Sequence, residues 1–169
     1  CTSCYFTIVV YFKLINSKII FNLILLVLFS LSVNSLVEIK NINVFFYILF
    51  HISFIYFIFY HYHFTIYILG LIYGILFDVL LLNYIGAHLF CFIFFISIYN
   101  LIKKYLLLLS SIQVSTVIFI ILILTLYSEL IFAFLFNNIY FSFSLMIKYL
   151  LISVFLFIPS IYLLNKLDK

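Results

Sequence analysis

Long apolar runs separated by short polar clusters dominate the sequence. Seventy per cent of the 169 residues are apolar and only 7% are charged. Soluble domains carry about 25% charged residues, and the eight basic and four acidic side chains here could not cover the surface of a water-soluble globule of this size. The composition therefore excludes a soluble enzyme, a nucleic-acid-binding protein and a secreted disulfide scaffold, and it predicts an all-α integral membrane protein.

The polar clusters divide the apolar sequence into six segments. A membrane-spanning helix needs about 20 mainly apolar residues, and backbone groups in lipid must be bonded within each segment, which favours helices. We therefore predict one compact bundle of about six transmembrane helices within residues 17–169, and we set residues 1–16 aside as an uncertain N-terminal extension. The predicted spans are residues 19–36, 44–60, 64–82, 86–102, 112–136 and 143–164.

The lysines predict the orientation of these spans. If the N-terminus is cytoplasmic, six of the eight lysines lie on the cytoplasmic side, where Lys and Arg are enriched. If the number of predicted spans were changed by one, the lysines would be divided evenly between the two sides of the membrane. The inside lysines are Lys13, Lys18, Lys103, Lys104, Lys166 and Lys169, and the outside ones are Lys40 and Lys148. Both termini are therefore predicted to face the cytoplasm.

Two acidic residues, Asp78 and Glu129, lie inside predicted spans. Carboxylates within a membrane are costly and point to function by default. A helical rise of 1.5 Å per residue places Asp78 about 6 Å and Glu129 about 10 Å from the outer ends of their spans. Because His88 and Lys148 enter at similar depths, we predict the pairs Asp78–His88 and Glu129–Lys148. These pairs either hold the bundle together or line an outward-facing cavity or partner surface.

Gly70 and Gly74 share one face of the 64–82 span with Asp78, because the three residues are four positions apart. Small residues at this spacing let transmembrane helices approach closely, so this face is expected to pack against protein, either within the bundle or on a partner. Pro159 is expected to kink or loosen the last span. His51 is interpreted as a hydrogen-bonded packing residue.

The sequence holds no nucleophile–base pair, phosphate-binding glycine loop or metal-ligand motif. We therefore predict a protein that is not an enzyme and that needs no cofactor or metal. The expected surroundings are membrane lipid and other membrane proteins, and the layout also allows an oligomer.

One stretch carries a family resemblance. Residues 70–89 read GLIYGILFDVLLLNYIGAHL, and residues 98–105 read IYNLIKKY. This stretch resembles the rod-shape-determining protein family MreD, whose most recognisable part is a glycine-bearing helix ending in Asp, a turn into Leu/Ile-Gly, and a helix with a Tyr near its basic end. The corresponding residues are Gly74, Asp78, Ile85, Gly86 and Tyr99, and the family's Pro and basic tail correspond to Pro159 and residues 163–166.

The resemblance implies a scaffold of the bacterial elongation machinery in the cytoplasmic membrane. Its expected partners are an MreC-like protein, cytoskeletal MreB and the lateral-wall peptidoglycan synthases, and it would help to set cell width and rod shape. The MreD architecture is also similar to that of substrate-binding subunits of energy-coupling-factor transporters, so a vitamin-uptake subunit is the alternative. The scaffold predicts that the face of Gly70, Gly74 and Asp78 contacts a partner helix, and the uptake subunit predicts a closed pocket near Asp78, His88 and Glu129.

Overall fold

Helices account for almost every residue that the computed structural model describes. The described residues are 19–31, 40–60, 62–82, 86–106, 109–137 and 142–167. A first helix, Ile19–Leu31, precedes α2. The other elements are α2 (Lys40–Tyr60), α3 (Thr65–Phe77), the π-helix η1 (Asp78–Leu82), α4 (Ala87–Leu106), α5 (Ser111–Asn137) and α6 (Phe143–Leu167).

The predicted all-α fold is confirmed, and the predicted spans are matched in part. Within the described ranges, four helices are long and apolar enough to cross a membrane. Their apolar stretches are Ile42–Tyr60, Ala87–Leu106, Ser111–Phe136 and Phe143–Lys166. Two shorter apolar helices, Ile19–Leu31 and Thr65–Leu81, correspond to the first and third predicted spans. Residues 1–16, residues 32–36 of the first span and the lysines at 13, 18 and 169 lie outside the described residues.

Several helices extend past the polar residues that we predicted to end them. α2 begins at Lys40 and not at position 44, and α4 and α6 continue to Leu106 and Leu167. Lysine and leucine are good helix formers, and a positive charge in the last turn interacts favourably with the negative end of a helix. Lys103 and Lys166 therefore lie within the last turns of α4 and α6.

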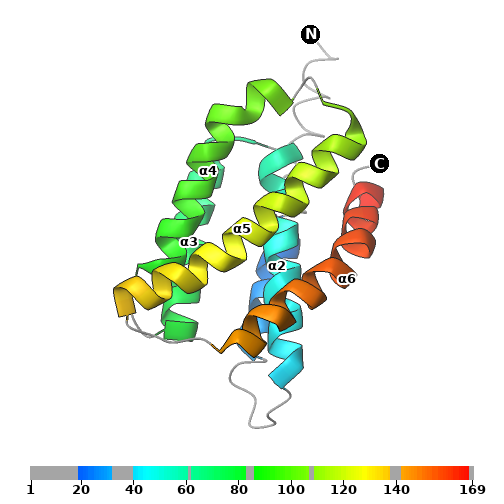
Figure 1. The fold of residues 1–169 in the computed structure, drawn as a ribbon. Helices are drawn as coiled ribbons and strands as arrows, with labels where there is room; N and C mark the ends of the chain where they lie inside the picture. The colour runs from blue at the N-terminus through cyan, green and yellow to red at the C-terminus, as the bar shows by residue number, and fades with distance from the viewer. Residues whose placement is uncertain are drawn as a thin grey trace.

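α2 lies at the centre of the bundle, with α3 and α4 on one side, α6 on the other and α5 crossing in front of it (Figure 1). In its apolar span 67% of the residues are buried, against 22% to 39% in the other three long helices. The ring of Phe50 in α2 packs against Tyr73 and Phe77 of α3, with centroids 5.1 and 4.8 Å apart. Phe54 packs against Phe92 of α4 at 5.2 Å. Aromatic rings thus hold the α3–α4 pair against α2.

α3 and α4 approach each other closely at two glycines. A Cβ atom added at Gly74 would lie 2.4 Å from Cα and 2.9 Å from N of Leu89, which are backbone atoms of α4. A Cβ atom at Gly70 would lie 2.5 Å from Cδ1 of Ile96, the end of a side chain. The glycine face therefore packs against protein, as predicted. The helix next to both glycines is α4 of the same chain, which agrees with the first of the two alternatives, packing within the bundle.

Tyr99 fastens the other end of α4 to the end of α2. Its hydroxyl donates to the carbonyl oxygen of Phe59 at 2.9 Å. Its ring packs against Phe59 and Tyr62, with centroids 4.8 and 5.2 Å apart. The ammonium group of Lys103 lies 4.4 Å from the centroid of the Tyr62 ring, within the range of a cation–π interaction. The predicted tyrosine near the basic end of this helix is therefore a contact between helices.

Pro159 lies inside α6, which remains helical from Phe143 to Leu167. A proline inside a helix removes one backbone hydrogen bond and crowds the preceding turn. In Figure 1 the two halves of α6 run in different directions, as the predicted kink requires.

Candidate functional site

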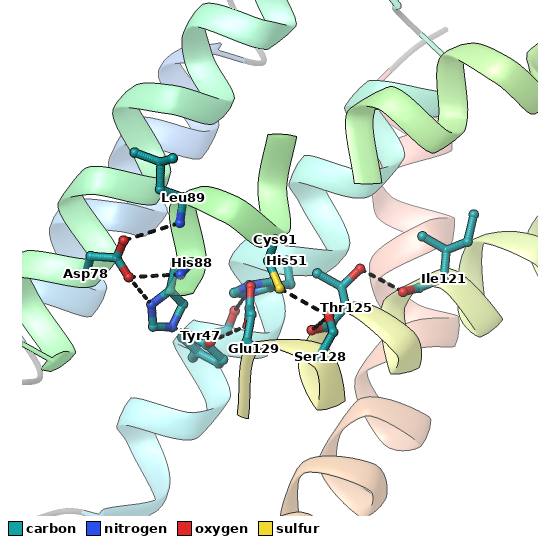
Figure 2. A network of polar contacts seen from close by, with 10 residues as sticks. All are labelled: Tyr47, His51, Asp78, His88, Leu89, Cys91, Ile121, Thr125, Ser128 and Glu129. Atoms are coloured by element: carbon teal, nitrogen blue, oxygen red, sulfur yellow. Dashed lines mark hydrogen bonds and ion pairs between the residues drawn. The ribbon is translucent and has the colours of Figure 1, made fainter. Parts of the chain in front are cut away.

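A buried polar network joins α2, η1, α4 and α5 (Figure 2). No member exposes more than 4% of its surface. Ionisable side chains buried at such depth are rare unless they are paired, and here each one contacts another member. The members are Tyr47 and His51 of α2, Asp78 of η1, His88 of α4 and Glu129 of α5.

Asp78 caps the N-terminus of α4. Its Oδ1 accepts from the backbone N–H of His88 at 2.8 Å, and its Oδ2 accepts from those of Gly86 at 2.6 Å and Leu89 at 3.3 Å. The first N–H groups of a helix have no partner within the helix, and an acidic side chain usually caps them from the residue just before it. In this protein the cap comes from the preceding helical segment, and it links that segment to the start of α4.

The backbone at Gly86 makes this cap feasible. Gly86 has φ of +150°, a conformation that L side chains rarely adopt, and glycine adopts it without a steric penalty. Its carbonyl oxygen accepts from the N–H of Phe90 at 2.9 Å, so Gly86 opens the first turn of α4 while its N–H points to Asp78. Asp78 and Gly86 therefore act together at the start of α4.

Asp78 also contacts the imidazole of His88, with Oδ1 and Nδ1 2.8 Å apart. The structure thus brings the predicted pair together. The other ring nitrogen, Nε2, lies 3.1 Å from the hydroxyl oxygen of Tyr47. His88 therefore connects the capped end of α4 to α2.

Glu129 is bonded on both carboxylate oxygens. Its Oε1 lies 2.8 Å from Nε2 of His51, and its Oε2 accepts a hydrogen bond from the hydroxyl group of Tyr47. Nδ1 of His51 in turn lies 2.8 Å from the backbone carbonyl oxygen of Tyr47, one helical turn earlier. The result is a continuous chain of contacts from Asp78 to His51.

The predicted pair of Glu129 with Lys148 does not form. Glu129 uses its oxygens on α2, whereas Lys148 is exposed on α6 and lines a surface groove with Phe45, Leu151 and Ile152. Similar depth along two helices does not bring two side chains together, because each helix also has to turn the correct face toward the other. The predicted pair considered only the depth of the two side chains and not the direction in which each helix turns them.

Two substitutions test the separation of Glu129 from Lys148. We expect Lys148→Gln to change the free energy of unfolding by less than about 0.5 kcal/mol, as is usual for an exposed side chain. We expect Glu129→Gln to be clearly destabilising, and the double variant to show the sum of the two effects within about 0.5 kcal/mol. Unfolding in mixed detergent micelles measures all three values. A coupling above 1 kcal/mol would restore the Glu129–Lys148 pair, and the matched cycle of Glu129→Gln with His51→Gln should show such a coupling.

A second polar contact and several aromatic rings lie next to the network. On α4, the Sγ atom of Cys91 lies 3.1 Å from Oγ of Ser128 on α5, and Ser128 donates to the carbonyl oxygen of Thr125 at 2.8 Å (Figure 2). Rings cover the remaining sides, including Phe77, whose centroid is 5.5 Å from that of Tyr47. Hydrogen bonds in such apolar surroundings are stronger than in water, and unpaired polar groups are costly.

The arrangement favours an internal link between helices over a ligand site. Both oxygens of Asp78 and Glu129, and both ring nitrogens of His51 and His88, have partners within the protein. Within the part of the chain that the structure describes, no three His, Cys, Asp or Glu side chains converge as a metal ion would require. Tyr47 separates the two acid–histidine pairs.

Sequence reasoning missed Tyr47, which was not singled out. His51 was interpreted as a hydrogen-bonded packing residue, and it is buried with both ring nitrogens bonded, but its partner Glu129 was not predicted. A usable signal was present, because Tyr47 and His51 are four residues apart and share a helical face. A hydroxyl and an imidazole together on one face of an apolar helix need polar partners, and Glu129, which we had paired with Lys148, is that partner.

Comparison of the chain with protein-family models, with curated proteins and with solved structures gave no match. The functional interpretation therefore depends on the residues and their geometry.

Proposed function

We propose that this chain is a non-enzymatic membrane scaffold of the bacterial cell-elongation machinery, similar in role to the MreD family. It would lie in the cytoplasmic membrane and help to set rod shape and lateral peptidoglycan synthesis. An MreC-like protein with one membrane span and a periplasmic domain is its expected direct partner, alongside membrane lipid.

The α3–α4 hairpin is the observation that supports this proposal most. Four residues that carry the resemblance each have a defined task in that hairpin or its attachment. Gly74 gives the close approach, Asp78 caps α4, Gly86 turns the chain into α4, and Tyr99 joins α4 to α2. The residues that carry the resemblance are thus the ones that build and attach this hairpin, and the step from this resemblance to function is an analogy.

We further propose six membrane spans with both termini in the cytoplasm. α4 and α6 end on the same side of the bundle (Figure 1), and their last turns carry Lys103, Lys104 and Lys166. Lys40 begins α2 at the opposite side. This asymmetry supports the cytoplasmic assignment of the α4 and α6 ends, because Lys and Arg are enriched in cytoplasmic segments.

The uptake subunit is less well supported by the geometry. That alternative requires polar groups near Asp78, His88 and Glu129 to face a pocket for a vitamin-sized molecule. In the structure these groups bond to one another and to α2. A ligand would have to replace those bonds with equally good ones.

Affinity purification in a mild detergent tests the proposal. The tagged chain is expressed at native level in its own host, cross-linked in living cells and recovered with its partners. We expect a single-span protein with a periplasmic domain among them, and depletion of the chain should turn rods into wider or spherical cells. An unrelated six-span protein with the same tag serves as the control for chance capture.

Two results would overturn the proposal. The first is unchanged cell width after complete depletion of the chain. The second is a stoichiometric small molecule in the purified protein together with an ATPase module among its partners, which would identify an uptake subunit.

A further inference from the structure

The polar network has two fixed ends. At one end, three backbone N–H groups donate to Asp78, which stabilises its charged carboxylate, so Nδ1 of His88 must donate to it. At the other end, Nδ1 of His51 faces the backbone carbonyl oxygen of Tyr47, which can only accept. Both imidazoles therefore carry a hydrogen on Nδ1 and direct Nε2 into the network.

Three contacts lie between these ends. Nε2 of His88 contacts the hydroxyl group of Tyr47, this hydroxyl contacts Oε2 of Glu129, and Oε1 of Glu129 contacts Nε2 of His51. A hydrogen bond holds one hydrogen, so these contacts hold three in all. With Asp78 ionised, three hydrogens leave the five side chains neutral as a group, and a neutral group has the lowest cost of burial in an apolar interior.

Three placements of these hydrogens satisfy every contact while Tyr47 keeps its neutral hydroxyl group. In the first, both imidazoles are positively charged and Glu129 is ionised. In the second, Tyr47 donates to a neutral His88, Glu129 is protonated on Oε2, and only His51 is charged. In the third, Tyr47 donates to Glu129, Glu129 is protonated on Oε1, and only His88 is charged.

We propose that the network is a proton relay that moves one positive charge between His88 and His51 through Tyr47 and Glu129. From the third placement to the second, the Nε2 proton of His88 passes to the oxygen of Tyr47. The hydroxyl proton of Tyr47 passes to Oε2 of Glu129, and the Oε1 proton of Glu129 passes to Nε2 of His51. No proton enters or leaves, and the net charge stays zero.

The relay connects the protonation of His51 on α2 and Glu129 on α5 to the contact between His88 and Asp78 in the α3–α4 hairpin. When His88 is charged, its contact with Asp78 is an ion pair, and when His88 is neutral this contact is a single charge-assisted hydrogen bond.

Other titratable groups around the relay come from two elements. Tyr149 of α6 packs its ring 5.7 Å from that of Tyr47, and Cys91 of α4 contacts Ser128. This activity is independent of the proposed scaffold role.

Nuclear magnetic resonance of histidine labelled with ¹⁵N tests the relay in the full chain reconstituted in lipid bilayers. We expect Nε2 of His88 and of His51 to resonate between the protonated and unprotonated positions. Glu129→Gln, which removes the transferable proton, should shift the His88 Nε2 signal. In a Tyr47→Phe background the same substitution should leave that signal in place, because the path is cut while the distance is kept.

The controls separate transfer from a through-space effect. His63, which contacts Thr65 outside the network, should not respond to any of these substitutions. If Glu129→Gln shifts the His88 Nε2 signal equally with and without the hydroxyl group of Tyr47, the relay is wrong. It is also wrong if Nε2 of His88 and Nε2 of His51 both carry no hydrogen in the wild type. Should Tyr47→Phe fail to fold, the carboxyl ¹³C signal of Glu129 in the wild type decides, since a signal fixed at the ionised position excludes the transfer.

Discussion

Gly74→Ala is expected to separate the α3–α4 hairpin, whereas Gly70→Ala is expected to be tolerated. The new methyl group at position 74 would lie 2.4 Å from the Cα atom of Leu89, and backbone cannot move away without shifting all of α4. Overpacking of this kind typically costs about 1–3 kcal/mol and occasionally more. We expect Gly74→Ala to be at or above the upper end of that range.

Gly70→Ala is the matched control on the same helix face. Its methyl group would lie 2.5 Å from the terminal Cδ1 of Ile96, a side-chain end that can rotate away, and at an ordinary contact distance of 3.8 Å from Phe54 and Phe92. Alanine also gains about 1 kcal/mol of helix propensity over glycine, so the net effect is expected to lie within about 1 kcal/mol of zero. Unfolding in mixed micelles measures both variants, and equal losses of stability would contradict the close approach at Gly74.

Asp78→Ala is expected to cause the largest loss of any single substitution in the network. It removes the acceptor of three backbone N–H groups and leaves His88 without its carboxylate. Removing one partner of a buried pair costs about 3–5 kcal/mol, and unpaired backbone donors add to that cost. We therefore expect the variant to lose its cooperative unfolding transition at ordinary temperatures.

Two comparisons locate the cause of that loss. Asp78→Asn keeps one acceptor oxygen but turns an amide NH₂ toward a backbone N–H. Its loss of unfolding free energy should therefore lie between zero and that of Asp78→Ala. Ser97→Ala on α4 removes a hydroxyl group bonded only to the carbonyl oxygen of Ile93 in its own helix, and it should change stability by less than about 0.5 kcal/mol. A stability of Asp78→Ala equal to that of Ser97→Ala would rule out the cap.

Much of the fold could be predicted from the sequence, because polar clusters interrupt a nearly uniform apolar background. The positions of α5 and α6 agree with the predicted spans to within a few residues. Helix ends at lysines were placed too early, since lysine continues a helix well. The π-helix at Asp78 was not predicted, because π-helical turns are rare and occur as single turns within otherwise α-helical segments.

The site divides into a local part and a distant part. Asp78 and His88 are ten residues apart, so their depths in two consecutive helices were enough to predict the pair. Glu129 contacts His51 and Tyr47, which precede it by 78 and 82 positions in the sequence. That α2 is its neighbour depends on how non-consecutive helices pack. No pattern in either segment alone contains that information.

The local origin of the Asp78 cap also bears on how the chain enters a membrane. Every donor to this carboxylate lies eight to eleven residues downstream. An aspartate in the middle of a lone membrane helix costs about 2.5–3.5 kcal/mol to insert, which is an upper limit for Asp78, four residues from the end of its segment. If α3 and α4 cross a membrane as proposed, we expect them to insert together, as a pair in which α4 already covers the charge of Asp78.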